Sequence, residues 1–87
     1  MYKLIFHKKA LKFVQKRTPE EKSRIDAKLK LLTKNPYPTN SQLDIKKLQN
    51  SEFYRLRISD YRFIYEIIED EVVILMLQAG NRGDIYK

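Results

Sequence analysis

The stretch that decides the fold runs from residue 54 to residue 65 and reads YRLRISDYRFIY. Apolar or aromatic residues alternate with mostly charged ones on both sides of Ser59-Asp60, which is the pattern of two half-buried strands joined by a two-residue turn. If these two residues form the turn, Arg57 lies directly across from Arg62. The sequence therefore predicts an antiparallel hairpin whose register is set by its turn.

The two faces of this hairpin differ in character. One face carries apolar and aromatic side chains, namely Tyr54, Leu56, Ile58, Tyr61, Phe63 and Tyr65. The other face carries Arg55, Arg57 and Arg62, and like charges directly across from each other destabilise a sheet unless an anion neutralises them. Guanidinium groups match the geometry of phosphate, so we expect an anion site here and the core on the first face. The alternative is a solvated surface on which Glu66 and Asp84 pair with the arginines.

A further strand is predicted over residues 72–79, after the acidic segment Glu69-Asp70-Glu71. A three-residue loop at this segment would place Arg62 opposite Gln78. A straight continuation of the strand would then bring Arg82 to the same face as the other arginines. The same register adds three apolar residues to that face, namely Ile64, Ile74 and Met76.

The residues before the hairpin predict one strand and two helices. Residues 2–7 alternate in polarity, as in a short strand with one apolar face. The next residues carry an apolar stripe at helical spacing, made of Ala10, Leu11, Phe13 and Val14. Thr18, Pro19 and Glu21 form the capping box of a second helix, which ends at Asn35-Pro36. Its apolar stripe is Ile25, Leu29 and Leu32.

The expected fold class is α+β, with two N-terminal helices packed on one face of a four-stranded, mostly antiparallel sheet in the order β-α-α-β-β-β. Residues 35–42 contain two prolines and predict a loop. Leu43, Ile45 and Leu48 are expected to pin the second half of this loop to the core. A chain of this length suits a single domain over residues 1–87.

Composition points to an anionic partner. The 18 Lys and Arg residues outnumber the 11 Asp and Glu residues, which gives a formal charge of +7. This charge attracts polyanions, so nucleic acid is the first candidate partner, although surplus lysine also serves solubility. The absence of cysteine excludes disulfides and thiolate metal sites. The longest aliphatic run, Val72–Leu77, is too short to cross a bilayer, so we expect a cytoplasmic protein with no membrane partner.

Three segments in this order resemble the RelE/ParE toxin superfamily: Tyr54-Arg55-Leu56-Arg57, Asp60-Tyr61-Arg62-Phe63-Ile64-Tyr65 and Gly80-Asn81-Arg82-Gly83-Asp84-Ile85-Tyr86. The resemblance implies the toxin of a type II toxin-antitoxin system with a RelE-like fold. It implies a ribosome-dependent endoribonuclease, an mRNA interferase that inhibits translation, with a cognate antitoxin, the ribosome and mRNA as partners. The alternatives are a DNA gyrase inhibitor of the ParE branch and a silent member that only binds RNA or antitoxin. Codon preference and the stoichiometry with antitoxin stay open.

The resemblance also implies site residues, namely Arg55, Arg57, Arg62, Arg82 and Tyr86. In this interpretation Arg55 and Arg57 bind RNA, while Arg62, Arg82 and Tyr86 are catalytic. Tyr86 is the candidate base, with an aromatic contact at the sheet edge as its alternative role. Because the 2′-hydroxyl of RNA can itself attack the adjacent phosphate, no metal or cofactor is expected.

The chain departs from relatives of this type at three places. Asn81 stands where many have histidine or lysine, and Arg55 and Arg57 stand where RelE has lysines. The sequence ends at Lys87, before the terminal helix that follows in RelE. The only histidine, His7, excludes catalysis by a histidine pair and is expected to be structural.

Overall fold

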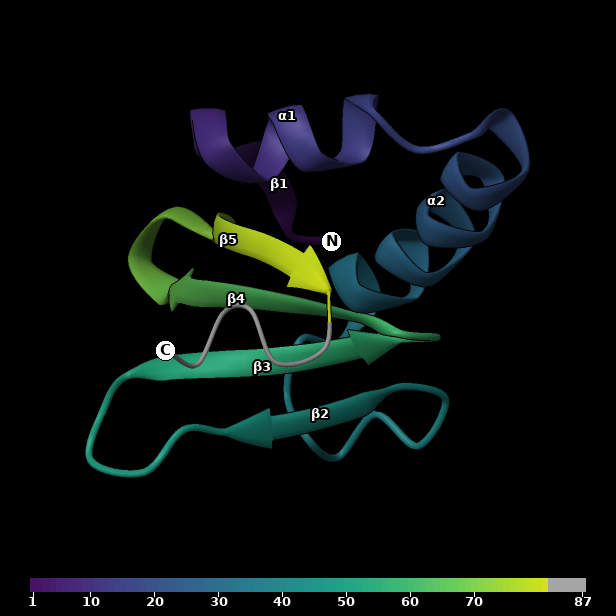
Figure 1. Ribbon diagram of the computed structural model, residues 1–87. Helices are drawn as coiled ribbons and strands as arrows, with labels where there is room; N and C mark the ends of the chain where they lie inside the picture. The colour runs from purple at the N-terminus through teal and green to yellow at the C-terminus, as the bar shows by residue number, and fades with distance from the viewer. Residues whose placement is uncertain (82–87) are drawn as a thin grey trace.

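The computed structural model describes residues 1–81, which form two helices and a five-stranded mixed sheet (Figure 1). The elements in chain order are β1 (Lys3–Phe6), α1 (Lys8–Gln15), α2 (Pro19–Lys34), β2 (Asp44–Lys47), β3 (Phe53–Ile58), β4 (Tyr61–Ile68), the 3-10 turn η1 (Glu69–Glu71) and β5 (Val73–Asn81). The strand order is β1-β5-β4-β3-β2. β1 runs parallel to β5, and the other neighbouring strands are antiparallel.

The central hairpin has the register that its turn predicts. Arg57 pairs with Arg62 and Leu56 pairs with Phe63, across a turn in which Ser59 has a φ of 52°. Both helices cover the face of Leu56 and Phe63, as expected. The core between helices and sheet contains Ala10, Ile25, Leu29, Leu32, Ile45, Leu56, Ile58, Phe63, Tyr65, Ile74 and Met76.

The prediction of four strands was wrong because residues 44–47 form β2 and not a loop. β2 pairs with β3, with Ile45 opposite Leu56, and Ile45 does join the core as expected. A four-residue strand gives too little alternation to be distinguished from a loop in sequence. Its backbone groups are satisfied by pairing with β3, which is a long-range partner that the local pattern does not reveal.

The predicted register between β4 and β5 was also wrong, by one residue at the turn. Val72 adopts a left-handed conformation, with φ 54° and ψ 49°, and lengthens the connection to four residues. Ile68 therefore pairs with Val73. A shift of one residue reverses the faces of a strand. Ile74 and Met76 accordingly lie in the core, and not on the face of the arginines.

A β-bulge then restores the original alternation of faces. The pairing shifts between Ile64 and Tyr65 on β4, and Leu77 is the extra residue on β5. Beyond the bulge, Arg62 pairs with Gly80 rather than with Gln78. Gln78 and Gly80 thus share the face of Arg62, as the sequence predicted for Gln78, although at a different position along the strand.

The helices are fixed to the sheet by aromatic and capping contacts. Phe13 of α1 packs edge-on against Tyr61 and Phe63, with ring centroids 5.4 and 6.4 Å apart. Leu11 does not follow the expected apolar stripe, since it is 41% exposed. The predicted capping box of α2 is present, and Glu21 also accepts a hydrogen bond from the Tyr61 hydroxyl, which ties the start of α2 to β4.

Thr18→Ala should lower the free energy of unfolding by about 1 kcal/mol, because it removes the side-chain acceptor that caps α2. Urea denaturation measures this loss. Ser23→Ala, an exposed change within the same helix, is the matched control and should shift stability by less than about 0.5 kcal/mol. Equal losses in both variants would contradict the capping role.

The same comparison should depend on pH. Hydrogen bonds from the backbone N–H and hydroxyl of Thr18 hold the pKa of Glu21 below its usual range. A lowered pKa in the folded state contributes stability above the unfolded pKa, and this contribution is lost as the pH falls through the folded value. The stability difference between wild type and Thr18→Ala should therefore narrow in acid.

Candidate functional site

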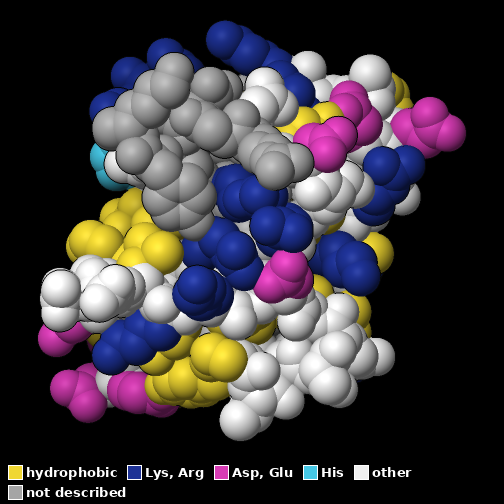
Figure 2. Space-filling view, turned by 60° about the horizontal axis from the view of Figure 1, so that its bottom comes forward, with side chains coloured by type: hydrophobic (Ala, Val, Ile, Leu, Met, Phe, Trp, Pro, Cys, Tyr) yellow, Lys and Arg dark blue, Asp and Glu magenta, His cyan; other side chains and the backbone are white. Residues whose placement is uncertain are grey.

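The three arginines predicted to share a surface do so. Arg55 and Arg57 come from β3 and Arg62 comes from β4, on the sheet face that the helices leave uncovered. We call this surface, defined by Arg55, Arg57 and Arg62, the arginine face. Figure 2 shows Lys and Arg side chains gathered on the side of the molecule where β2 and β3 lie. The strand pairing thus concentrates positive charge in one place.

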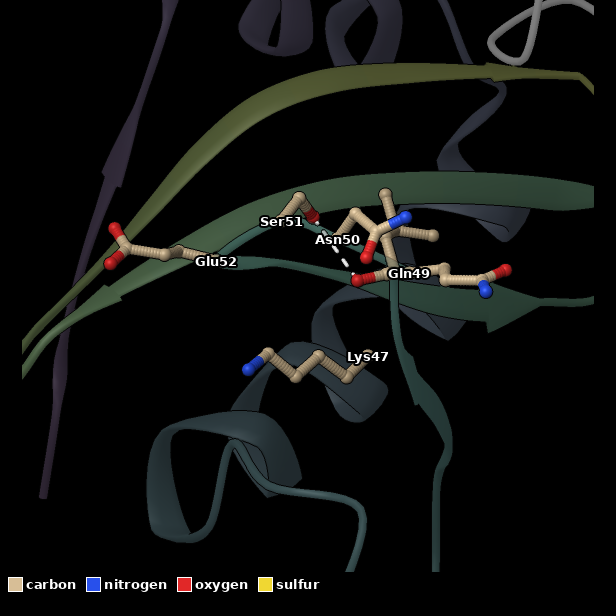
Figure 3. Close-up of a pocket in the computed structure, with 6 residues that line it drawn as sticks. Lys47, Gln49, Asn50, Ser51 and Glu52 are labelled. Carbon is tan, nitrogen blue, oxygen red and sulfur yellow. Dashed lines mark hydrogen bonds between the residues drawn. The ribbon is translucent and has the colours of Figure 1, made fainter.

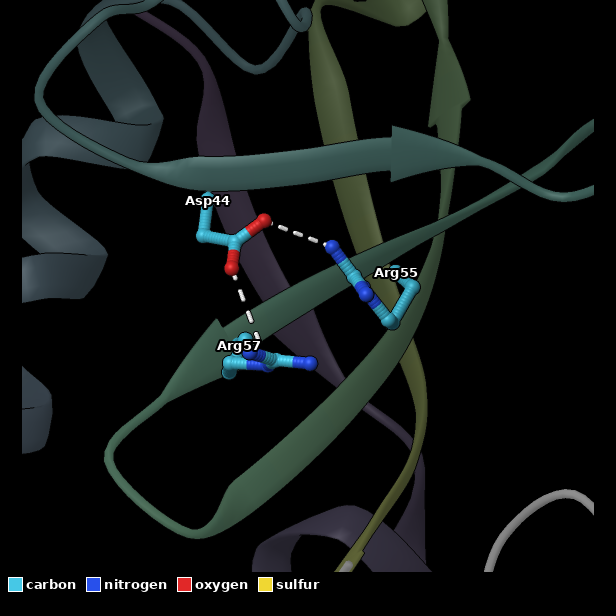
Figure 4. Close-up of polar contacts among 3 residues, drawn as sticks. All are labelled: Asp44, Arg55 and Arg57. Carbon is cyan, nitrogen blue, oxygen red and sulfur yellow. Dashed lines mark hydrogen bonds and ion pairs between the residues drawn. The ribbon is translucent and has the colours of Figure 1, made fainter.

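Asp44 of β2 is the acidic partner of this cluster. Its Oδ1 lies 2.6 Å from Nη2 of Arg55, and its Oδ2 lies 3.6 Å from Nε of Arg57 (Figure 4). In the alternative interpretation of a solvated surface, the acidic partners were Glu66 and Asp84. Glu66 forms no ion pair within residues 1–81, and Asp84 lies outside the described residues. Sequence reasoning missed Asp44 because its place beside Arg57 depends on β2.

The cluster keeps an excess of positive charge, and two of its three guanidiniums are largely buried. Arg62 is 6% exposed, and the side chain of Arg55 is 12% exposed. Burying a guanidinium costs free energy unless it is paired. Within residues 1–81 the only ion pairs are those of Asp44 with Arg55 and Arg57, so the cluster has one paired carboxylate for three guanidiniums. Such a surface favours binding of an anion that can accept several hydrogen bonds.

Two hollows adjoin the arginine face. The larger has a volume of about 340 Å³ and is lined by Lys46, Lys47, Leu48, Gln49, Arg55 and Arg62. The smaller, of about 120 Å³, is lined by Arg57, Ser59, Asp60 and Arg62. Arg62 lines both, so it lies between them. Lys46 pairs with Arg55 across the strands and is a fourth cation that sequence analysis did not assign to the site.

A third hollow, larger than these two, lies in the loop between β2 and β3 (Figure 3). Its volume is about 530 Å³, and its lining is Lys47, Leu48, Gln49, Asn50, Ser51 and Glu52. The Ser51 hydroxyl donates to the Leu48 carbonyl at 3.2 Å, so a polar side chain here serves the turn itself. The lining combines one lysine with one glutamate and concentrates no charge. We therefore assign the candidate site to the arginine face.

Several proton-transfer candidates have structural roles. His7 caps α1, where its Nδ1 accepts a hydrogen bond from the Lys9 N–H at 3.2 Å. Tyr65 donates to the Pro36 carbonyl at 2.6 Å, and burial raises the pKa of its phenol, so it stays protonated. Arg82 and Tyr86 lie outside the described residues, and their predicted positions stay predictions.

The described residues give two further results. Residues 1–81 contain no group of three or more His, Cys, Asp or Glu side chains placed to hold a metal ion. Neither helix in this part of the chain is long and apolar enough to cross a membrane.

Sequence comparison finds toxins of one class. A family model described as the ParE toxin of the type II toxin-antitoxin system parDE matches residues 4–86. A protein of Methanocaldococcus jannaschii that carries the name RelE1 toxin is 32% identical over 82 residues. This match covers 93% of this chain and 90% of the relative.

Solved structures share the fold over almost the whole chain. The archaeal RelE-RelB complex from Pyrococcus horikoshii contains a chain that aligns with a TM-score of 0.80 and 28% identity, over 95% of this chain and 97% of that one. The intact Escherichia coli RelBE toxin-antitoxin complex gives a TM-score of 0.75 and 27% identity, over 93% and 96% of the two chains. The family model, the relative and the shared fold agree with one another. The chain therefore belongs to the RelE/ParE superfamily, as a toxin of a type II toxin-antitoxin system.

Proposed function

We propose that this toxin is a metal-independent endoribonuclease that cleaves messenger RNA on the ribosome and thereby stops translation. The observation that carries the proposal is the arginine face: three guanidiniums from two strands, two of them largely buried, with Asp44 as the single paired carboxylate in residues 1–81. A phosphodiester supplies the anionic oxygens that such a surface accepts.

The reaction uses a nucleophile that the RNA itself carries. The 2′-oxygen attacks the adjacent phosphorus, a new P–O2′ bond forms, and the P–O5′ bond breaks. The products are a cyclic phosphate and a free 5′-hydroxyl. Arg55 and Arg57 bind the phosphate, and Arg62 stabilises the negative charge that develops on its oxygens. Arginine does not give up its proton usefully, so these residues act through charge and hydrogen bonds.

The proton transfers are assigned to residues after Asn81. Tyr86, as the phenolate, takes the proton of the 2′-hydroxyl. Arg82 stabilises the negative charge on the leaving 5′-oxygen, which takes a proton from water and ends as a hydroxyl. A free phenol titrates near pH ~10, and neighbouring guanidiniums favour its ionised form. The ribosome completes the reaction by holding the message in a conformation where attacking and leaving oxygens are in line.

The proposed cellular partners follow from charge. Lysines on the helices, including Lys12, Lys16 and Lys28, give the toxin a second basic surface for ribosomal RNA. The solved relatives are complexes of RelE with RelB, and we propose that a cognate antitoxin likewise binds this toxin and neutralises the arginine face. The site of action is the cytoplasm, where ribosomes are.

Gyrase inhibition is the second candidate, because the matching family model carries the ParE name. In that case the arginine face would contact protein or DNA without cleaving a nucleic acid. The two functions predict different damage, to messages in one case and to DNA in the other.

The first functional test is an in vitro translation reaction with and without the toxin, followed by mapping of the 5′ ends of the message. We expect cuts confined to translated message, which persist at EDTA concentrations that leave ribosomes intact. A parallel supercoiling reaction with gyrase is the control for the second candidate. Whole messages together with gyrase-linked DNA breaks would contradict the proposed function.

Arg62→Ala should lower the cleavage rate by about a hundredfold or more, as loss of a charge-stabilising donor does in other enzymes. Arg62→Lys keeps the charge but loses the paired N–H donors of the guanidinium, so its rate should lie between those of wild type and Arg62→Ala. Arg24→Ala, an exposed arginine on α2, is the matched control and should cut at the wild-type rate. Thermal melting checks that the Arg62 variants are folded. Equal rates for all variants would remove Arg62 from the site.

Arg82→Ala and Tyr86→Phe should each reduce the cleavage rate without lowering the melting temperature. Tyr86→Phe removes only the hydroxyl, so an aromatic contact is preserved while the base is lost. Single-turnover cleavage on programmed ribosomes measures both. If the two variants cut as fast as wild type, the roles assigned to Arg82 and Tyr86 are wrong.

A further inference from the structure

Asp44 holds two of the three arginines at once. Its Oδ1 receives a hydrogen bond from Nη2 of Arg55, and its Oδ2 lies within ion-pair distance of Nε of Arg57. Figure 4 shows the carboxylate lying between the two guanidiniums, on the strand next to them. Because Asp44 pairs with Arg57 in the strand register, the backbone itself places the carboxylate there.

This contact restrains charges that otherwise repel each other. Arg55 and Arg57 are two residues apart on one strand face, and Arg57 lies opposite Arg62. Long arginine side chains lose conformational freedom when they are held together, and a fixed carboxylate reduces both the repulsion and the number of rotamers. Asp44 thus restrains both guanidiniums before any ligand arrives.

The ion pairs with Asp44 leave one hydrogen-bond donor of Arg55 without a partner. Nε of Arg55 is buried and has no hydrogen-bond partner within residues 1–81. Arg55 lines the larger hollow, together with Arg62. A buried donor without an acceptor costs free energy, and an anion that reached Nε would remove this cost. Asp44 itself is about half exposed, so it can remain in place while a ligand binds.

We propose that Asp44 is a positioning residue of the RNA site: it fixes the guanidiniums of Arg55 and Arg57 in the orientation that receives the scissile phosphate. This inference rests on the proposed ribonuclease function and deepens it. Asp44 has a second effect, because its negative charge opposes the approach of RNA. Orientation and affinity are therefore in conflict at this residue.

That conflict gives the Asp44→Asn variant a distinctive signature. Loss of the charge should tighten binding of a short fluorescein-labelled single-stranded RNA and steepen the dependence of log K on log salt by about 0.7, the slope of one added phosphate contact. Loss of orientation should lower the single-turnover cleavage rate on saturated ribosomes by roughly tenfold to a hundredfold. Affinity and rate thus move in opposite directions.

Two variants control the experiment. Asp26→Asn makes the same charge change at an exposed position on α2 and should alter neither the rate nor the affinity by more than a small fraction of the Asp44→Asn effect. Asp44→Glu restores the carboxylate on a longer stem, so it should return RNA affinity to the wild-type value and recover part of the rate. Thermal melting of each variant reports on folding.

The outcomes separate this inference from the proposed function. A wild-type rate in Asp44→Asn overturns the positioning role, and so does a parallel loss of rate, affinity and melting temperature, which indicates a structural role. If the wild-type toxin binds RNA but cuts no translated message, the proposed function is wrong. The binding measurements then decide alone: unchanged affinity and salt slope in Asp44→Asn overturn the role of Asp44 at the anion site.

Discussion

The pairing of β3 with β4 is the constraint on which the rest of the molecule depends. One register places Leu56 against Phe63 under the helices and, at the next position, Arg57 against Arg62 on the uncovered face. The free energy gained by burying the first pair offsets the repulsion of the second, so the hydrophobic core holds together charges that would separate on their own. Packing of the hydrophobic core thus holds the arginines of the site close together.

The elements with strong local signals could be predicted from sequence. The capping box at Thr18 and the turn at Ser59-Asp60 each specify a position along the chain without reference to distant residues, and both are present as expected. The elements that failed depend on distant or unusual backbone. β2 exists because β3 offers it an edge, and Val72 adopts a left-handed conformation that β-branched residues rarely enter. Neither is visible in a local pattern of polarity.

Some residues of the candidate site could likewise be predicted from sequence, and others could not. Its arginines could be found because alternation assigns each strand residue to a face, and the hairpin turn fixes which positions are opposite. Asp44 and Lys46 could not be found, since their place beside Arg57 and Arg55 follows only from the pairing of β2 with β3. The pattern of charges along the sequence therefore predicts the arginines of the site but not Asp44, the carboxylate that restrains two of them.

Because of the left-handed Val72 and the bulge at Leu77, β5 contributes residues both to the core and to the arginine face. The extra turn residue Val72 places Ile74 and Met76 on the core face of the sheet. The extra residue of the bulge then reverses the alternation, so that Gly80 lies on the same face as Arg62. Gly80, which has no side chain, is the residue that pairs with Arg62. The extra residue of the turn thus decides which residues of the first half of β5 enter the core, and the extra residue of the bulge decides which residues of its second half lie on the arginine face.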